Sequence, residues 1–67
     1  MNVKDLVETD PCPLYSVKPR TYVNWLDQIF FFDHIDGMYS YCTATDGRVV
    51  HIGAAAIVKP LVKQEEL

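Results

Sequence analysis

Two Asp-Gly pairs, Asp36-Gly37 and Asp46-Gly47, constrain this chain more than any other feature of its sequence. An Asp-Gly pair between stretches of β-forming residues is a strong local signal for a β-hairpin, because both residues tolerate the positive φ angles of tight hairpin turns. Residues 28–35, 38–44 and 48–52 flank the two pairs and are rich in β-branched and aromatic side chains. The sequence therefore predicts a three-stranded antiparallel meander over residues 28–53.

The rest of the chain predicts further short strands around this meander. Residues 21–25 form one strand, and residues 57–62 form a last strand that Pro60 confines to a sheet edge or to the end of the strand. Pro11 and Pro13 hold the end of an N-terminal extension, residues 1–13, extended, and residues 63–67 form a polar tail. We expect a single, mainly β domain over residues 1–67. Its strands, about five, would form a small SH3-like or OB-like barrel or a curled antiparallel meander.

Strand register predicts which side chains share a face. A two-residue loop at Asp36-Gly37 pairs Ile35 with Met38 and predicts a core face made of Phe30, Phe32, His34, Tyr39 and Tyr41. The opposite face then carries Ile29, Phe31, Asp33, Ile35, Met38, Ser40 and Cys42.

The second turn leaves two registers open. A two-residue loop at Asp46-Gly47 places His51 opposite Cys42. A three-residue loop over residues 45–47, with Gly47 in the left-handed conformation, places His51 opposite Tyr41 and on the face of His34.

Charge and composition argue against several classes of function. The 67-residue chain has a net charge of −3, and residues 26–47 contain no Lys or Arg but four Asp, which argues against nucleic-acid binding. The first ten residues lack the apolar stretch of a signal peptide, and no apolar run is long enough to cross a membrane. We therefore expect a soluble, cytoplasmic protein with no membrane partner.

The cysteines and histidines predict neither a metal site nor an active site. Cys12 and Cys42 are expected to be reduced, a disulfide between them being the alternative. His34, His51 and Cys42 do not have the paired, closely spaced ligands of a zinc site, so no metal or cofactor is expected. A pair of Cys42 and His51 could form a thiolate–imidazole dyad, but Cys42 is better explained as a small buried apolar side chain. We expect no enzymatic activity.

The stretch "FFFDHIDGMYSYCTATDGRVVHIGAAAIV" resembles short stand-alone proteins encoded by bacteriophages. The resemblance lies in a hairpin of the pattern F-x-H-x-DGMYS-x-C, a second glycine turn, an apolar strand with a histidine and a final short strand. It implies a small viral accessory protein that binds and modulates another protein, such as a host protein, in the host cytoplasm. It supplies no catalytic residues.

A non-enzymatic protein-interaction module is the function that these observations favour. Apolar side chains on both predicted faces motivate it, and a homodimer is its simplest form. The mixed face and the one tryptophan give the candidate partner-binding residues, which are Phe31, Asp33, Ile35, Met38, Ser40 and Trp25. Two alternatives are a single-stranded nucleic-acid binder that uses Tyr39, Tyr41 and Trp25, and a structural component of a phage particle.

Overall fold

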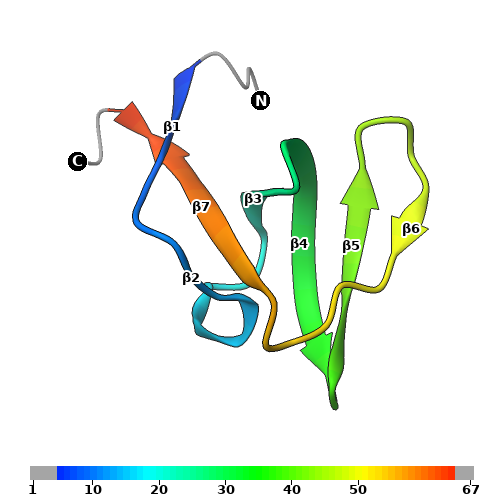
Figure 1. Cartoon of the computed structure of the whole chain (residues 1–67). Coiled ribbons are helices and arrows are strands. Elements are labelled where there is room, and N and C mark those ends of the chain that lie inside the picture. The colour runs from blue at the N-terminus through cyan, green and yellow to red at the C-terminus, as the bar shows by residue number, and fades with distance from the viewer. Residues whose placement is uncertain (1–4, 65–67) are drawn as a thin grey trace.

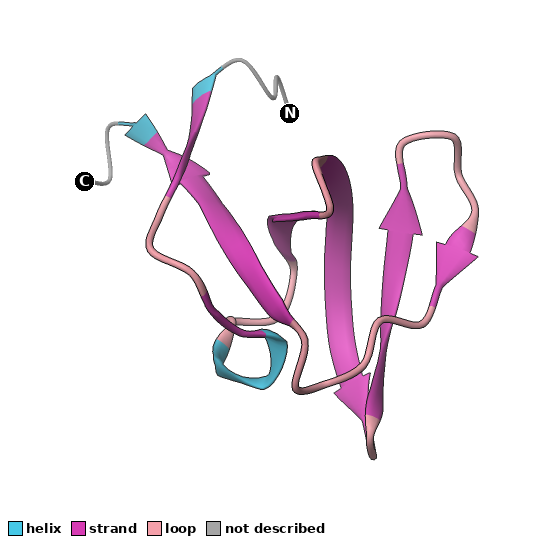
Figure 2. Ribbon diagram, in the orientation of Figure 1, coloured by secondary structure: helices cyan, strands magenta, loops and turns pink. Residues whose placement is uncertain are grey.

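One antiparallel sheet of seven strands makes up most of this computed structural model, which describes residues 5–64. The strands lie in the order β1-β7-β3-β4-β5-β6, and β2 also pairs with β7 (Figure 1). Figure 2 shows that loops and short helical turns connect the strands. The elements are β1 (Leu6–Glu8), β2 (Cys12–Pro13), the 3-10 turn η2 (Leu14–Ser16), β3 (Thr21–Trp25), β4 (Gln28–Asp36), β5 (Tyr39–Ala44), β6 (Val49–Val50) and β7 (Ile57–Lys63).

The sheet is open and curled. Its pairing runs from β1 at one end to β6 at the other and does not close on itself within the described residues. In Figure 1, β7 (orange) runs at a steep angle to β4 and β5 (green), as the cumulative twist between neighbouring strands requires. The prediction of a mainly β, curled antiparallel meander is therefore confirmed, and the SH3-like or OB-like barrel is not what these residues form. None of the helical turns within residues 5–64 has the length and apolar character to cross a membrane.

The strand that contains Pro60 is central in the sheet. β7 pairs with β3 on one side and with β1 and β2 on the other, so the prediction that Pro60 marks an edge or a strand end is wrong. Val23 lies opposite Pro60 on β3, and the Pro60 carbonyl points the other way and accepts a hydrogen bond from the Thr9 N–H at 2.8 Å. The nitrogen of Pro60, which carries no hydrogen, therefore faces the break between β1 and β2. Neither strand pairs with β7 at this position, so no ladder hydrogen bond is lost there.

The N-terminal segment contributes to this sheet. Within the extension predicted for residues 1–13, the described residues 5–13 contain β1 and β2, both paired with β7. The first residue of the polar tail predicted for residues 63–67, Lys63, is the last residue of β7. Residues 1–4 and 65–67 lie outside the described residues.

The register of the β4–β5 hairpin differs from the predicted one. Asp36 pairs with Tyr39, so the two-residue loop is Gly37-Met38, and Gly37 alone adopts the positive φ (67°). This register is offset from the prediction, and a β-bulge between Phe32 and His34 shifts it again along β4. The offset at the tip is two residues, so His34, Tyr39 and Tyr41 still share one face. Beyond the bulge the offset is one residue, and this turns the β5 side chains to the opposite face relative to Phe30 and Phe32 from the one predicted.

These two shifts decide the composition of the core. Phe30 and Phe32 of β4 are buried as predicted, but Ser40, Cys42 and Ala44 are the buried side chains of β5. The prediction that His34, Tyr39 and Tyr41 belong to the core is wrong, and so is the placement of Ser40 and Cys42 on the opposite face. The apolar core also receives side chains from η2, β3, β7 and the segments between strands, which are Leu14, Val17, Val23, Ile52 and Val58.

The β5–β6 turn follows the second of the two predicted registers. The Ala44 N–H donates to the Arg48 carbonyl at 2.8 Å across a loop of residues 45–47, and Gly47 has a φ of 92°. Asp46 accepts hydrogen bonds from the backbone N–H of Arg48 at 3.1 Å and from its Nε at 2.7 Å. The first of these bonds, with the nearby guanidinium, holds the pKa of Asp46 below its ordinary value.

The β3–β4 turn, Leu26-Asp27, has a conformation that its sequence does not favour. Leu26 and Asp27 have φ angles of 54° and 61° between the paired residues Trp25 and Gln28. Two positive φ angles in a two-residue hairpin loop are typical of a type I′ turn, for which Asn-Gly is the preferred pair. Leu26 is also 72% exposed, so its side chain gains little from burial.

We expect the double replacement Leu26→Asn and Asp27→Gly to raise the free energy of unfolding by about 1 kcal/mol, because it relieves left-handed strain in residues that carry a Cβ. Urea denaturation measured by far-UV circular dichroism checks this result. Leu26→Ala is the control, since it removes the exposed side chain and keeps the strained φ. A double variant no more stable than this control would contradict the strain argument.

Candidate functional site

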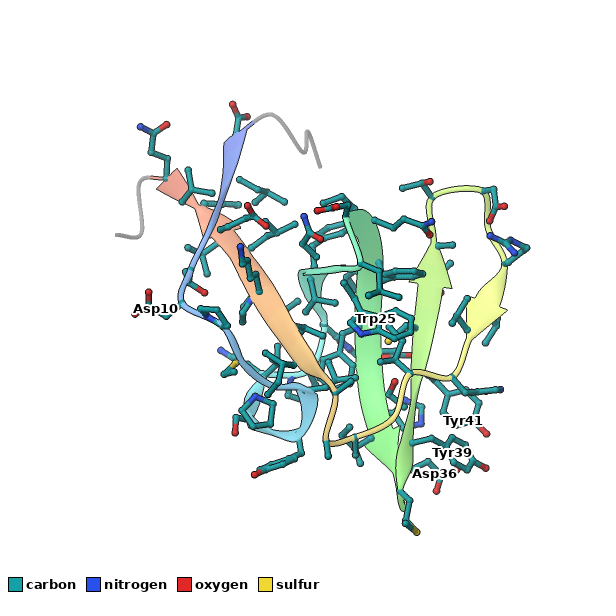
Figure 3. The ribbon with its side chains drawn as sticks, in the orientation of Figure 1. Asp10, Trp25, Asp36, Tyr39 and Tyr41 are labelled. Carbon is teal, nitrogen blue, oxygen red and sulfur yellow. The ribbon has the colours of Figure 1, made fainter. Side chains whose placement is uncertain are left out.

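Four aromatic and imidazole side chains gather on the outer face of the β4–β5 hairpin, which is the face turned away from the core. We call them the Tyr-His patch. Two of them, Tyr39 and Tyr41, lie with Asp36 near the tip of the hairpin (Figure 3). The members of the patch are His34, Tyr39, Tyr41 and His51.

Ring contacts hold the Tyr-His patch together. The His34 ring stacks on Tyr41 with centroids 4.8 Å apart, and the His51 ring meets Tyr41 edge-on at 4.7 Å. Tyr39 contacts His51 at 5.2 Å. The bulge in β4 brings His34 opposite Tyr41, and the three-residue β5–β6 loop brings His51 onto the same face. Two irregular features of the backbone therefore build the patch.

His51 is oriented by the backbone. Its Nδ1 lies 2.9 Å from the Ser40 carbonyl oxygen. A carbonyl only accepts, so Nδ1 carries the proton and donates it. In the neutral imidazole, Nε2 is then the acceptor and is free of this contact. His51 thus presents a ring edge of defined polarity on the outer face.

Carboxylates border the Tyr-His patch. Asp36 precedes the hairpin loop and pairs with Tyr39, and Asp33 Oδ2 lies 3.7 Å from Nδ1 of His34, with both side chains 53% exposed. Tyr39, followed by the Asp36 carboxylate, raises the pKa of Tyr41, because the ionised phenolate would stand beside other negative charge. Tyr41 is therefore a neutral hydroxyl, and thus a hydrogen-bond donor, well beyond neutral pH.

Cys42 lies on the other side of the sheet from His51. The Ser40 hydroxyl donates to the Ile52 carbonyl at 2.8 Å, which leaves its oxygen to accept from the Cys42 thiol at 3.2 Å. Burial raises the pKa of the Cys42 thiol, and the contact with Ser40 offsets this only in part. The structure therefore forms no Cys42–His51 dyad, and both Cys12 and Cys42 are free thiols.

Within residues 5–64, no three His, Cys, Asp or Glu side chains come together in a way that could hold a metal ion. The two histidines of the Tyr-His patch and its two bordering carboxylates are arranged around tyrosine rings. All four of these side chains are exposed, so the arrangement can donate, accept and stack against a ligand that lies on the surface.

The candidate partner-binding residues of the sequence analysis divide between the two faces. Asp33 is exposed beside the Tyr-His patch, and Met38 is 88% exposed at the hairpin tip. Phe31 is half-buried on the outer face against the Tyr22 ring at 5.0 Å. The other three face inward: Ile35 and Trp25 pack against the core, and Ser40 is completely buried, which rules out a surface role for it.

Tyr39 and Tyr41 were predicted to belong to the core, with a nucleic-acid-binding surface as the alternative, and Asp36 and His51 were not among the predicted partner-binding residues. One signal in the sequence could have corrected this. Along β5 the large residues Tyr39 and Tyr41 alternate with the small residues Ser40, Cys42 and Ala44. A core that already contains Phe30 and Phe32 from the neighbouring strand has room for small side chains opposite them, not for two more tyrosines.

Comparison with known proteins does not identify a relative. No protein-family model, no curated protein and no solved structure matches this chain.

Proposed function

We propose that this protein is a non-enzymatic protein-binding module that recognises a positively charged segment of its partner through the Tyr-His patch. The observation that carries the proposal is the cluster of four outward-facing rings bordered by Asp33 and Asp36. In the cell it would act as an accessory protein that modulates the partner, and a host protein bound by a phage-encoded chain in the cytoplasm fits the sequence resemblance.

The residue types of the patch suit protein recognition. Tyrosine supplies a large contact area and loses little conformational entropy on binding, and it is enriched among the residues that dominate interface energies. The ring contacts of Tyr41 with both histidines further restrict its side chain before a partner arrives.

The charges beside the patch suit a basic partner. Arginine and lysine are attracted to the faces of tyrosine rings, and their charged groups form strong hydrogen bonds to carboxylates. Asp33 and Asp36 supply such carboxylates next to the rings. The same carboxylates would repel a phosphate backbone. Trp25 packs against the core, so it does not share a face with Tyr39 and Tyr41, as a base-stacking surface would require.

Affinity capture tests the proposal. The tagged protein is incubated with nuclease-treated bacterial lysate, and the captured proteins are quantified by mass spectrometry for the wild type, for Tyr41→Ala and for Thr43→Ala. Thr43 is the control because it is exposed on the same strand and the same face, outside the patch. We expect a partner that Thr43→Ala retains and that Tyr41→Ala captures about tenfold less, as for a hot-spot residue.

Circular dichroism shows whether Tyr41→Ala keeps its fold. Capture of the same proteins at equal yield by folded Tyr41→Ala would refute the Tyr-His patch as the binding surface. So would proteins that are captured from untreated lysate and lost after nuclease treatment.

A further inference from the structure

A second binding feature lies away from the Tyr-His patch. It is a groove of about 630 Å³, and no residue of the patch lines it. We call it the β3–β7 groove, because it opens where these two strands diverge. It is lined by the last residues of β7, the first residues of β3 and the connection between η2 and β3, together with Leu6 of β1 and Cys12 of β2.

The strand pairing explains why the groove exists. The β3–β7 ladder ends at the pair Tyr22 and Leu61, while β7 continues to Lys63, paired on its other side with Leu6 of β1. The start of β3 turns toward β4 instead: the Arg20 N–H donates to the Phe32 carbonyl at 2.8 Å. Alternation along β7 directs the backbone N–H and C=O of Lys63 toward the side that β3 has left. The β3–β7 ladder therefore supplies no partner for the backbone groups of Lys63 on this side.

Positive charge is concentrated in the β3–β7 groove. Lys18, Arg20 and Lys63 line it, all three are exposed, and none of its described lining residues is acidic. The ion pairs within residues 5–64 involve other side chains, namely those of Arg48 with Asp46 and of His34 with Asp33. In a chain of net charge −3, three of the six Lys and Arg residues therefore border one groove and lack a carboxylate partner among the described residues.

Arg20 is held in a conformation that its side chain does not favour. Its φ is 65°, in the left-handed region that glycine adopts at lower cost. The bond from its N–H to the Phe32 carbonyl fixes this conformation at the entry to β3. Strained backbone of this kind is found preferentially at binding and catalytic sites. Here it places a guanidinium on the wall of the groove.

The interior of the groove is largely apolar. Val17, Tyr22 and Leu61 line it, together with the half-buried Cys12. An extended peptide directs alternate side chains to opposite sides. A segment in which acidic and apolar residues alternate can therefore bring its apolar side chains to this surface while its carboxylates meet the cations.

We propose that the β3–β7 groove binds an extended acidic segment of a protein, in which acidic and apolar residues alternate. The segment adds to the free side of β7, and Lys18, Arg20 and Lys63 receive its carboxylates. A nucleic-acid strand fits less well, since Tyr22 is the only aromatic side chain among the described lining residues and base stacking uses several. This site is separate from the Tyr-His patch, so a result that refutes one of the two proposals does not refute the other.

The test uses a designed probe, the acetylated peptide Glu-Leu-Glu-Val-Glu-Leu with a fluorescent label. Its binding is measured by fluorescence anisotropy at low ionic strength, where exposed charge pairs contribute most. Cys12 provides a second readout because it lines the groove, whereas Cys42 is buried in the core. We expect saturable binding, and we expect the bound peptide to slow alkylation of Cys12 by N-ethylmaleimide without changing that of Cys42.

Two matched variants locate the binding. Lys63→Glu and Lys59→Glu make the same charge change at exposed positions of β7, and only Lys63 lines the groove. We expect Lys63→Glu to weaken peptide binding about tenfold, since an attraction becomes a repulsion. Lys59→Glu is expected to change it by less than about twofold. Tyr41→Ala, which alters the Tyr-His patch, should leave the affinity unchanged.

Several results would overturn the groove proposal. One is equal weakening by Lys63→Glu and Lys59→Glu, which would show attraction to net charge alone. Another is tighter binding of a short oligothymidylate with protection of Cys12, which would assign the groove to nucleic acid. Protection of Cys12 that rises with protein concentration in the absence of peptide would assign it to a second copy of the chain. Absence of saturable peptide binding to the wild type would also overturn it.

Discussion

Phe32→Ala is expected to lower the free energy of unfolding by about 3–5 kcal/mol, the cost of removing a buried aromatic ring and leaving a cavity. Phe32 is 1% exposed and lies on the inner face of β4, opposite Cys42 of β5 and Thr21 of β3. A domain of this size has a total stability of roughly 3–10 kcal/mol. Urea denaturation followed by circular dichroism should therefore show a population that is largely unfolded, or a midpoint close to zero denaturant.

Phe31→Ala is the matched control for this experiment. Phe31 is the neighbouring residue of the same type, but it lies on the outer face, half-buried against the Tyr22 ring. Its replacement loses one aromatic contact and part of a buried surface, which should cost about 1–1.5 kcal/mol. If Phe31→Ala destabilises the protein as much as Phe32→Ala, the assignment of the two faces of β4 is incorrect.

Ser40→Lys is expected to prevent folding. Ser40 is fully buried, and its hydroxyl bridges the Cys42 thiol and the Ile52 carbonyl. A lysine at this position would overpack the core and bury an ammonium group without a carboxylate, at a cost of several kcal/mol. Circular dichroism and the fluorescence of Trp25, which packs against the same core, measure the loss of structure.

Two further variants separate the charge from other effects of substitution at Ser40. Ser40→Ala removes the hydrogen bonds and adds no charge, and should cost about 1–2 kcal/mol. Thr43→Lys introduces the same lysine at an exposed position of β5 and should change the stability by less than about 0.5 kcal/mol. In the register predicted from the sequence, Ser40 faces outward and Ser40→Lys would be tolerated. A folded Ser40→Lys protein would therefore favour that register over the observed one.

The two proposed binding features have opposite charge and different origins. The Tyr-His patch is built on the hairpin by a bulge and a turn, and it is bordered by Asp33 and Asp36. The β3–β7 groove is formed by strands distant in sequence and is lined by cations. Under the two proposals, the protein would engage a basic segment at one site and an acidic segment at the other.

The features that depend on neighbouring residues could be predicted from the sequence. β-Forming side chains predicted strands over residues 21–25 and 28–35, which match β3 and, to within one residue, β4. Phe30 and Phe32 were correctly placed in the core. The glycine of each Asp-Gly pair takes the positive φ of its turn, and the three-residue β5–β6 loop was one of two registers that the sequence allowed. These features follow from local conformational preferences that the rest of the fold does not override.

The direction of the β5 side chains, and with it the composition of the site, depends on packing between the strands. A shift of one residue turns every side chain of a strand to the other face. The choice between the two registers depends on the volume available opposite Phe30 and Phe32, which the small residues Ala44 and Cys42 fit. The bulge beside Asp33 then shifts the register by one more residue toward the hairpin tip, which pairs His34 with Tyr41 on the outer face.

The position of Pro60 and the β3–β7 groove also depend on pairing between strands that are distant in the sequence. Pro60 is tolerated in a central strand because its missing N–H faces a break between β1 and β2, segments about fifty residues earlier in the chain. The β3–β7 groove exists because β3 turns toward β4 while β7 continues beside β1. Neither fact can be obtained from the residues near Pro60 or Lys63, since each depends on which distant backbone groups are left to be paired.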